Sequence, residues 1–305
     1  MIFWPNNRVS GAGNLAAAIS KLLGFYSPLS KDPKATLYGN GVSPSHILQG
    51  SIGDCYMICS LASIATTPSR IEKMFLTKKY AAEGIVSMLV YIKGRPEVIT
   101  LDDKLPYGTG NTLFLRKTAD SAYWAHFAEK LFAKINVNYE YIGFGWMSEA
   151  LYIFTGAPTV MVKPTALSTD NLWSVMVDAY KKNFILTAAC LSASTGVIGG
   201  HAYSVLAVTP IYDASGALVE RLVLVRNPWG YSEFSGNWSD FSSVWTAAYK
   251  AQVPNHAWST GDGYFYMSVK DFQTIFAYYT ITYYHDDFNL SFYEANGLGA
   301  NRLNL

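Results

Sequence analysis

The hydrophobic pattern of the chain changes its period near residue 160, and this change constrains the fold more than any other feature. Before it, apolar residues recur at intervals of three and four, which is typical of helices with one buried face. After it, β-branched and aromatic runs alternate with turn signals such as Asp213-Ala214-Ser215-Gly216. Helices followed by strands predict an α+β fold, with two lobes that meet at a cleft.

Several segments carry these patterns clearly. Helices are expected from Cys55, after Asp120 and over residues 171–182. Residues 69–72 (SRIE) match a capping box that starts a further helix. The runs IVSMLVYI and EVITL predict a hairpin. Later strands are expected from FILTAACL, HAYSVLAVTPIY, LVERLVLVRN, GYFYMS and YYTITYY.

The same patterns divide the chain into three regions. Residues 1–45 are rich in Gly, Ser, Pro and Asn and are expected to form an N-terminal arm. Residues 46–160 are the helix-rich lobe, and residues 161–305 are the β-rich lobe. With 305 residues, half of them hydrophobic, the chain has enough apolar material for both lobes.

Composition excludes several classes of protein. A formal net charge of +1 argues against a nucleic-acid partner, which needs clustered positive charge. The longest apolar runs have the length of strands, so no transmembrane segment is expected. Three cysteines are too few for a disulfide framework, and the first residues, MIFWPNNRVS, do not match a signal peptide. A cytoplasmic location is therefore expected.

One cysteine lies where a helix is expected to begin. Cys55 follows Gly53-Asp54 and precedes an apolar helical pattern. Free N–H groups in the first turn of a helix stabilise a thiolate, so this position suits a nucleophile. Cysteine is also among the most often buried residues, and by position alone a packing role stays open. Cys59, one turn later, is expected in the core.

A histidine and an asparagine complete a pattern of thiol catalysis. His201 follows Gly199-Gly200 and starts a strand, so its side chain is expected at the edge of a sheet. Asn227 ends another strand before Pro228, and its amide can orient an imidazole without adding charge. The chain order Cys, His, Asn is the order that a papain-type thiol hydrolase needs.

These segments resemble the active-site blocks of the calpain family of papain-like cysteine proteases. The three blocks are QGSIGDCYMICSLASIA, GGHAYSVLAV and VRNPWG. The likeness continues through VITLDDKLPY, AYWAHFAEKLFAKINVNYE, SGNWSDFSSVW and DGYFYMSVKDF, and covers about residues 45 to 284. The resemblance implies a papain-like core of two lobes with the active-site cleft between them.

The resemblance also implies a role for each residue of the site. Cys55 would be the nucleophile, and His201 would be its general base and then the acid for the leaving amine. Asn227 would orient His201. The side-chain amide of Gln49 and the backbone N–H of Cys55 would form the oxyanion hole. Each residue also has a purely structural alternative: a buried cysteine, a strand histidine, a turn asparagine and a loop glutamine.

The resemblance is weakest at the two core calcium sites of the family. At the first, His46 and Ala122 stand in place of two carboxylates, so this site is predicted to be lost. At the second, Tyr264 stands where another carboxylate is common. The acidic residues retained there are Glu233, Asp240 and Asp262. Two interpretations stay open for them: a calcium site, or carboxylates on solvated loops.

The function that follows is a calpain-like cysteine endopeptidase acting through a thioester acyl-enzyme. Its partners would be protein or peptide substrates, and Gly200 and Trp229 would line the substrate cleft. The chemistry needs no cofactor, with calcium at one core site as the only candidate, and nothing identifies a regulatory subunit. The alternative is a catalytically silent pseudo-protease that binds or regulates. Acyl transfer of the transglutaminase type ranks lower, because its third member is usually Asp where this chain has Asn227.

Overall fold

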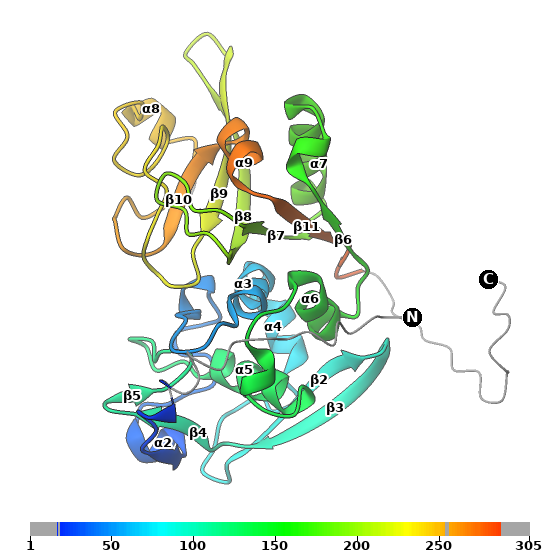
Figure 1. Ribbon diagram of the computed structural model, residues 1–305, viewed down its shortest axis with the longest axis vertical. Coiled ribbons are helices and arrows are strands. Elements are labelled where there is room, and N and C mark those ends of the chain that lie inside the picture. The colour runs from blue at the N-terminus through cyan, green and yellow to red at the C-terminus, as the bar shows by residue number, and fades with distance from the viewer. Residues whose placement is uncertain (1–16, 18, 254–255, 288–305) are drawn as a thin grey trace, which may run out of the picture.

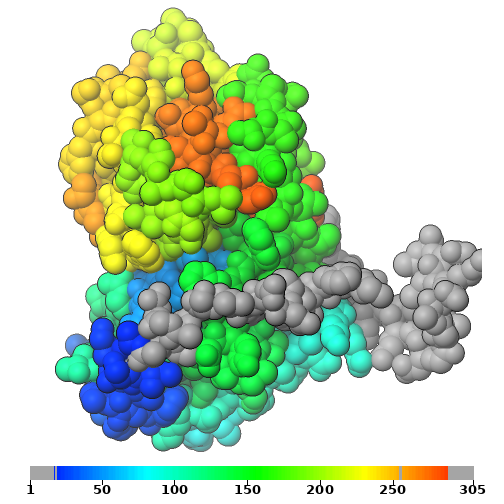
Figure 2. Space-filling model, viewed as in Figure 1, coloured from blue at the N-terminus to red at the C-terminus, as the bar shows by residue number. Residues whose placement is uncertain are grey.

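The computed structural model describes residues 17, 19–253 and 256–287 (Figure 1). Its first part is mainly helical, and its second part is built on one antiparallel sheet. Figures 1 and 2 show the second part above the first, so the two halves of the sequence form two layers of the molecule. The predicted α+β class, with helices first and sheet second, is confirmed. No helix in the described ranges is long and apolar enough to cross a bilayer.

The first part packs its helices around one hydrophobic core. The helices are α2 (Pro28–Lys31), α3 (Cys55–Ile64), α4 (Pro68–Met74), α5 (Trp124–Ile135) and α6 (Met147–Thr155), with short 3-10 turns at Pro44–His46 and Glu140–Ile142. Helix α5 is the helix expected after Asp120. Its apolar residues Trp124, Phe127, Ala128 and Leu131 belong to this core, and the partly buried Ile135 packs against it. Helix α3 goes further, since all of its residues are buried.

Small sheets complete the first part. Strands β2 (Ile85–Ile92) and β3 (Arg95–Asp102) form the predicted hairpin. Strands β1 (Gly24–Tyr26), β4 (Leu105–Gly108) and β5 (Asn111–Thr112) form a three-stranded sheet. Residues 24–26 of the predicted arm therefore pair with the helical part, while residues 1–16 and 18 of that arm lie outside the described residues.

The predicted capping box at residues 69–72 is wrong. Helix α4 begins one residue earlier, at Pro68, and its N-cap Thr67 makes no side-chain capping bond. Proline is well suited to the first helical position, because its ring sets φ and the missing N–H is not needed there. Helix α4 thus begins at Pro68 and has no capping box that starts at Ser69.

The second part is a six-stranded sheet in the order β10-β9-β8-β7-β11-β6, with every neighbouring pair antiparallel. The strands are β6 (Thr159–Val162), β7 (Ile185–Cys190), β8 (His201–Tyr212), β9 (Leu218–Arg226), β10 (Tyr264–Ser268) and β11 (Tyr278–Thr282). The helices are α7 (Thr169–Lys181), α8 (Ala247–Lys250) and α9 (Val269–Ile275), with a 3-10 turn at Pro164–Ala166. The predicted strand runs are confirmed.

The central strand β7 has a helix on each face, which explains its continuous apolar sequence. Side chains alternate between the faces of a strand. Ile185 belongs to the core of the first part, whereas Leu186, Ala188 and Cys190 belong to the core beneath α7 and α9. The sheet of the second part is therefore also a wall of the first core, and α3 packs against β7 and β8 there.

Two buried serines connect α3 to the sheet. Ser63 donates its hydroxyl to the Leu186 carbonyl over 2.7 Å. Ser204, on β8, donates to the Cys59 carbonyl over 2.8 Å. Because both hydroxyls are buried away from water, breaking either bond is costly, and the two bonds fix the position of α3 along strands β7 and β8.

We expect Ser204→Ala to lower the free energy of unfolding by about 1 kcal/mol, because a buried hydrogen bond between α3 and β8 is lost. Urea unfolding measures the change, and Ser243→Ala, at an exposed loop serine, is the matched control. An unfolding free energy equal to that of the wild type would contradict a stabilising role for this bond.

Candidate active site

A cavity of about 400 Å³ lies where the two parts meet. The first part supplies Gln49, Gly53, Cys55 and Phe144 to its wall, and the second part supplies Gly200, His201, Trp229 and Tyr231. Five of the residues singled out in the sequence, Gln49, Cys55, Gly200, His201 and Trp229, thus line one space. The sixth, Asn227, is fully buried behind His201.

Cys55 is the first residue of α3, and its side chain is at the wall of the cavity. The sulfur contacts the backbone N–H of Ala202, the residue that follows His201, and N–H groups of its own helix turn. These donors favour the thiolate, but burial outweighs them and raises the pKa of the Cys55 thiol to about 11. The resting sulfur is therefore a protonated thiol at neutral pH.

His201 begins β8, and Asn227 fixes its ring. Asn227 Oδ1 lies 2.8 Å from His201 Nε2 and also accepts the backbone N–H of Trp229 over 3.0 Å. Asn227 Nδ2 donates to the Ser232 carbonyl over 2.9 Å, which identifies the oxygen of the amide as the atom facing the imidazole. Nε2 must then carry the proton, and Nδ1 keeps the lone pair that a general base needs.

Burial dominates the acidity of His201. It lowers the pKa of the imidazole to about 4, against the opposing effect of the bond to Asn227. Together with the raised pKa of the Cys55 thiol, this makes the resting pair a neutral thiol and a neutral imidazole. Proton transfer between them belongs to the reaction and not to the resting state.

Trp229 and Gly200 shape the second side of the cavity. The ring centroids of Trp229 and His201 are 4.7 Å apart, so the indole covers the imidazole and its bond to Asn227. Gly200 has φ of +64°, in the left-handed region that favours glycine, while the space beside its Cα is open. The glycine lets the chain turn into β8 without a side chain in front of His201.

Gln49 is buried at the cavity wall, and half of its amide is already engaged. Nε2 donates one hydrogen to the Ile52 carbonyl over 2.7 Å, which leaves its second hydrogen for another acceptor. The backbone N–H of Gln49 donates to the Pro228 carbonyl over 2.8 Å. This bond joins the loop of Gln49 to the segment that carries Trp229.

Arg116 is a residue of the site that sequence reasoning missed. Its Nε donates to the Gln49 carbonyl over 3.0 Å, and its Nη2 donates to the Trp229 carbonyl. One guanidinium thereby holds one wall of the cavity against the other. The sequence contains no signal for it, because both of its acceptors are backbone carbonyls of distant segments.

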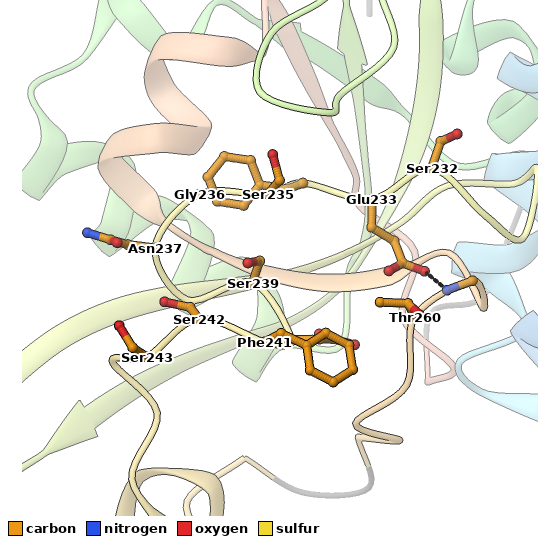
Figure 3. A pocket seen from close by; sticks show the side chains of 13 residues that line it. Ser232, Glu233, Ser235, Gly236, Asn237, Ser239, Phe241, Ser242, Ser243 and Thr260 are labelled. Carbon is orange, nitrogen blue, oxygen red and sulfur yellow. Dashed lines mark hydrogen bonds between the residues drawn. The ribbon is translucent and has the colours of Figure 1, made fainter.

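Two of the three acidic residues predicted as calcium ligands, Glu233 and Asp240, line a second, open cavity of about 670 Å³, and Figure 3 shows Glu233 there. Asp262 directly follows Gly261, the last residue of this lining. Glu233 Oε1 accepts the backbone N–H groups of residues 261, 262 and 263 at 2.8 to 3.0 Å. Asp262 accepts from the Tyr264 N–H and the Ser259 hydroxyl. Asp240 is buried against His256, with 2.8 Å between Oδ1 and Nε2.

These contacts decide whether a cation fits. In the described part of the chain, no three His, Cys, Asp or Glu side chains gather where they could hold a metal ion. A calcium ion needs several oxygen ligands at one point. Here protein groups already engage one oxygen of Glu233, one of Asp240 and both of Asp262. Calcium binding at this loop stays a prediction of the sequence.

His46 is held by hydrogen bonds within the protein. Trp124 Nε1 donates to His46 Nδ1 over 2.8 Å, so Nε2 carries a hydrogen toward Asp120, 3.1 Å away. Asp120 also accepts the backbone N–H of Asn40 over 2.9 Å. The histidine thus packs into the loop as a hydrogen-bonding residue.

A thiol at the start of a helix, an imidazole at the start of a strand and an amide behind it form an arrangement of the kind that papain-like cysteine proteases use. A family model for calpain family cysteine proteases matches residues 26–283. The chain belongs to this family.

Among curated relatives, the chain is 31% identical over 259 residues to calpain-type cysteine protease DEK1 of Arabidopsis thaliana. The aligned region covers 80% of this chain and 12% of the relative. It is 28% identical over 276 residues to human calpain-14, with 87% and 40% covered. It is 29% identical over 247 residues to the calpain-1 catalytic subunit of Sus scrofa, and this alignment covers 76% of this chain and 34% of the relative. The chain thus spans less than half the length of these relatives.

Because the imidazole of His201 is buried, we expect it to make the free energy of unfolding depend on pH in the acid range. The pKa of His201 falls from an ordinary value of 6.5 to about 4 on folding, so the unfolded chain binds more protons between these values. The contribution of His201 to the free energy of unfolding should therefore decrease as the pH falls from 6.5 toward 4, whereas the raised pKa values of Asp54 and Glu129 contribute in the opposite direction. We expect His201→Gln to flatten this dependence, measured by urea unfolding at pH 7 and pH 5.

The buried His126 remains in that variant and keeps part of the slope, because burial lowers its pKa to about 3. An unchanged slope in His201→Gln would show that His201 titrates as it does in the unfolded chain.

Proposed function

We propose that the chain is a calpain-type cysteine endopeptidase with a papain-like core, in which the two parts act as lobes and the substrate lies in the cavity between them. One observation carries the proposal. Cys55 and His201 line the same cavity from different parts of the chain, while Asn227 holds Nε2 of the imidazole. This leaves Nδ1 as the basic atom of the ring.

The reaction would begin at the neutral pair. As the Cys55 sulfur attacks the carbonyl carbon of a peptide bond, His201 Nδ1 takes the thiol proton. The carbonyl oxygen becomes an oxyanion, for which the Cys55 N–H and the second N–H of Gln49 are the candidate donors. When the tetrahedral intermediate collapses, the C–N bond breaks, the amine leaves with the proton of His201, and a thioester remains.

Water completes the cycle. His201 accepts a proton from a water molecule that attacks the thioester carbonyl, and the C–S bond then breaks. The thiolate recovers the proton from the imidazolium and the acid product leaves. Every proton moves between substrate, water, Cys55 and His201, so no cofactor takes part in the chemistry.

Family membership supports protein or peptide substrates for this site. The relatives named above carry the activity in their names, as calpain-type proteases or calpains, and we extend it to this chain as a proposal. All three cysteines are free thiols. This state suits a reducing compartment, and we keep a cytoplasmic location as part of the proposal.

Cys55→Ala and His201→Ala should each lower the rate of peptide hydrolysis by about 10⁴-fold or more, because neither half of the pair works alone. Hydrolysis of casein or a fluorogenic peptide measures the rate. The matched control is Cys59→Ala, one helical turn away in the same buried helix, which should keep activity. Hydrolysis that persists in Cys55→Ala would refute the proposal.

The pseudo-protease alternative has its own readout. Iodoacetamide should label Cys55 in the wild type and give no label at this position in Cys55→Ala. A wild-type Cys55 that stays unlabelled, together with no hydrolysis, would favour a binding or regulatory role.

We expect hydrolysis to continue in the presence of a calcium chelator, because one oxygen of Glu233, one of Asp240 and both of Asp262 are already bound by N–H, hydroxyl and imidazole groups. The measurement is the initial rate against calcium concentration, with chelator plus excess magnesium as the control. Calorimetric titration with calcium reads binding apart from activity. A rate that vanishes with chelator and returns with calcium would restore the calcium site predicted from the sequence.

A further inference from the structure

We propose that Asp54 and Glu129 form a proton-sharing carboxyl pair beneath the nucleophile, and that the charge of this pair controls how readily the Cys55 thiolate forms. The inference deepens the proposed function and rests on it for the role of Cys55. Both carboxyls lie outside the mechanism described above, and they act as positioning residues.

The pair is placed by two helices. Asp54 is the N-cap of α3 and directly precedes Cys55. Glu129 comes from the middle of α5. Asp54 is 0% exposed and Glu129 is 3% exposed, and the two carboxyls lie close enough for each to shift the pKa of the other. Two acidic side chains that are distant in sequence therefore meet under the first turn of the nucleophile helix.

The surroundings contain little to compensate two negative charges. Within the described residues, no N–H or hydroxyl of another residue bonds to either Asp54 oxygen, and Glu129 Oε1 is likewise unpaired except by this contact. Glu129 Oε2 receives the Leu115 N–H at the long distance of 3.4 Å. Two buried carboxylates with no cation between them cannot both ionise, so they must hold at least one proton.

Burial determines where that proton resides. It raises the pKa of Asp54 to about 7 and that of Glu129 well above its usual range. Below about pH 7 both carboxyls are neutral. Above it, Asp54 is a carboxylate that accepts the hydroxyl of Glu129. The pair thus gains one negative charge close to neutral pH, one residue away from the reactive sulfur.

That charge acts on the nucleophile. The titratable groups that face the pair are Cys55 and Cys59 on α3 and Tyr139 beyond α5. An ionised Asp54 raises the pKa of the Cys55 thiol and opposes the partial positive charge at the start of α3. When Asp54 is neutral, the partial positive charge at the start of α3 stabilises the Cys55 thiolate without this opposition.

The test is the pH profile of Cys55 alkylation by iodoacetamide in the whole chain, followed by mass spectrometry of the Cys55 peptide. The wild type should show an inflection near pH 7, where Asp54 ionises. Asp54→Asn cannot acquire the charge, so its rate above pH 7 should exceed that of the wild type by about tenfold, the effect of one unit of pKa.

Glu129→Gln should do the opposite at lower pH. Its amide N–H donates permanently to Asp54 and keeps it ionised below pH 7, so labelling near pH 6 should be slower than in the wild type. Profiles that keep the wild-type shape in both variants, with the rate lowered equally at every pH, would overturn the proposal in favour of a merely structural contact.

Two further readouts keep the test decisive. If a variant does not fold, the infrared carbonyl band of a protonated carboxyl is sought in the wild type and in Cys55→Ala at pH 8, and its absence overturns the proposal. Alkylation also needs no turnover. An inflection near pH 7 in a chain that hydrolyses nothing would support the pair while refuting the endopeptidase, whereas hydrolysis without the inflection would do the reverse.

Discussion

The packing of α3 against strands β7 and β8 is the constraint on which the site depends. The sulfur belongs to the first residue of the helix and the imidazole to the first residue of β8, so their relative position is set by how helix and strand slide on each other. Ser63 and Ser204 fix that position with buried hydrogen bonds in opposite directions. Because α3 is buried on every side, no neighbouring element can yield without opening the core.

Once α3 is packed in this way, backbone N–H and carbonyl groups orient the other side chains of the site. Asn227 is oriented by the Ser232 carbonyl and the Trp229 N–H, and it alone decides which imidazole nitrogen is basic. Arg116 binds two carbonyls, one in each wall. Backbone partners hold their positions through the fold, so these side chains are oriented before any substrate arrives.

The sequence predicted most of what is local and little of what is long-range. Periodicity located the helices and strands, and the spacing of three motifs identified Cys55, His201 and Asn227. The pairing of Asp54 with Glu129 was missed, although Glu129 lies between the buried Ala125 and Ala133, one turn away on either side, in a helix that is buried almost all round. A carboxyl in such a context was a usable signal, but nothing in one sequence indicates which residue shares its proton.

The calcium prediction likewise concerns contacts that are long-range in the chain. Acidic residues at suitable spacing say that oxygens are available, but their donors are chosen by the folded chain. Glu233 receives three N–H groups from a turn about thirty residues further on. The buried Arg226 adds positive charge that acts on Asp262 and lies 5.0 Å from the Tyr264 ring, where the family commonly places a carboxylate. The acids that suggest a metal in the sequence are thus also acceptors that close the loop, through Glu233 Oε1 and both oxygens of Asp262.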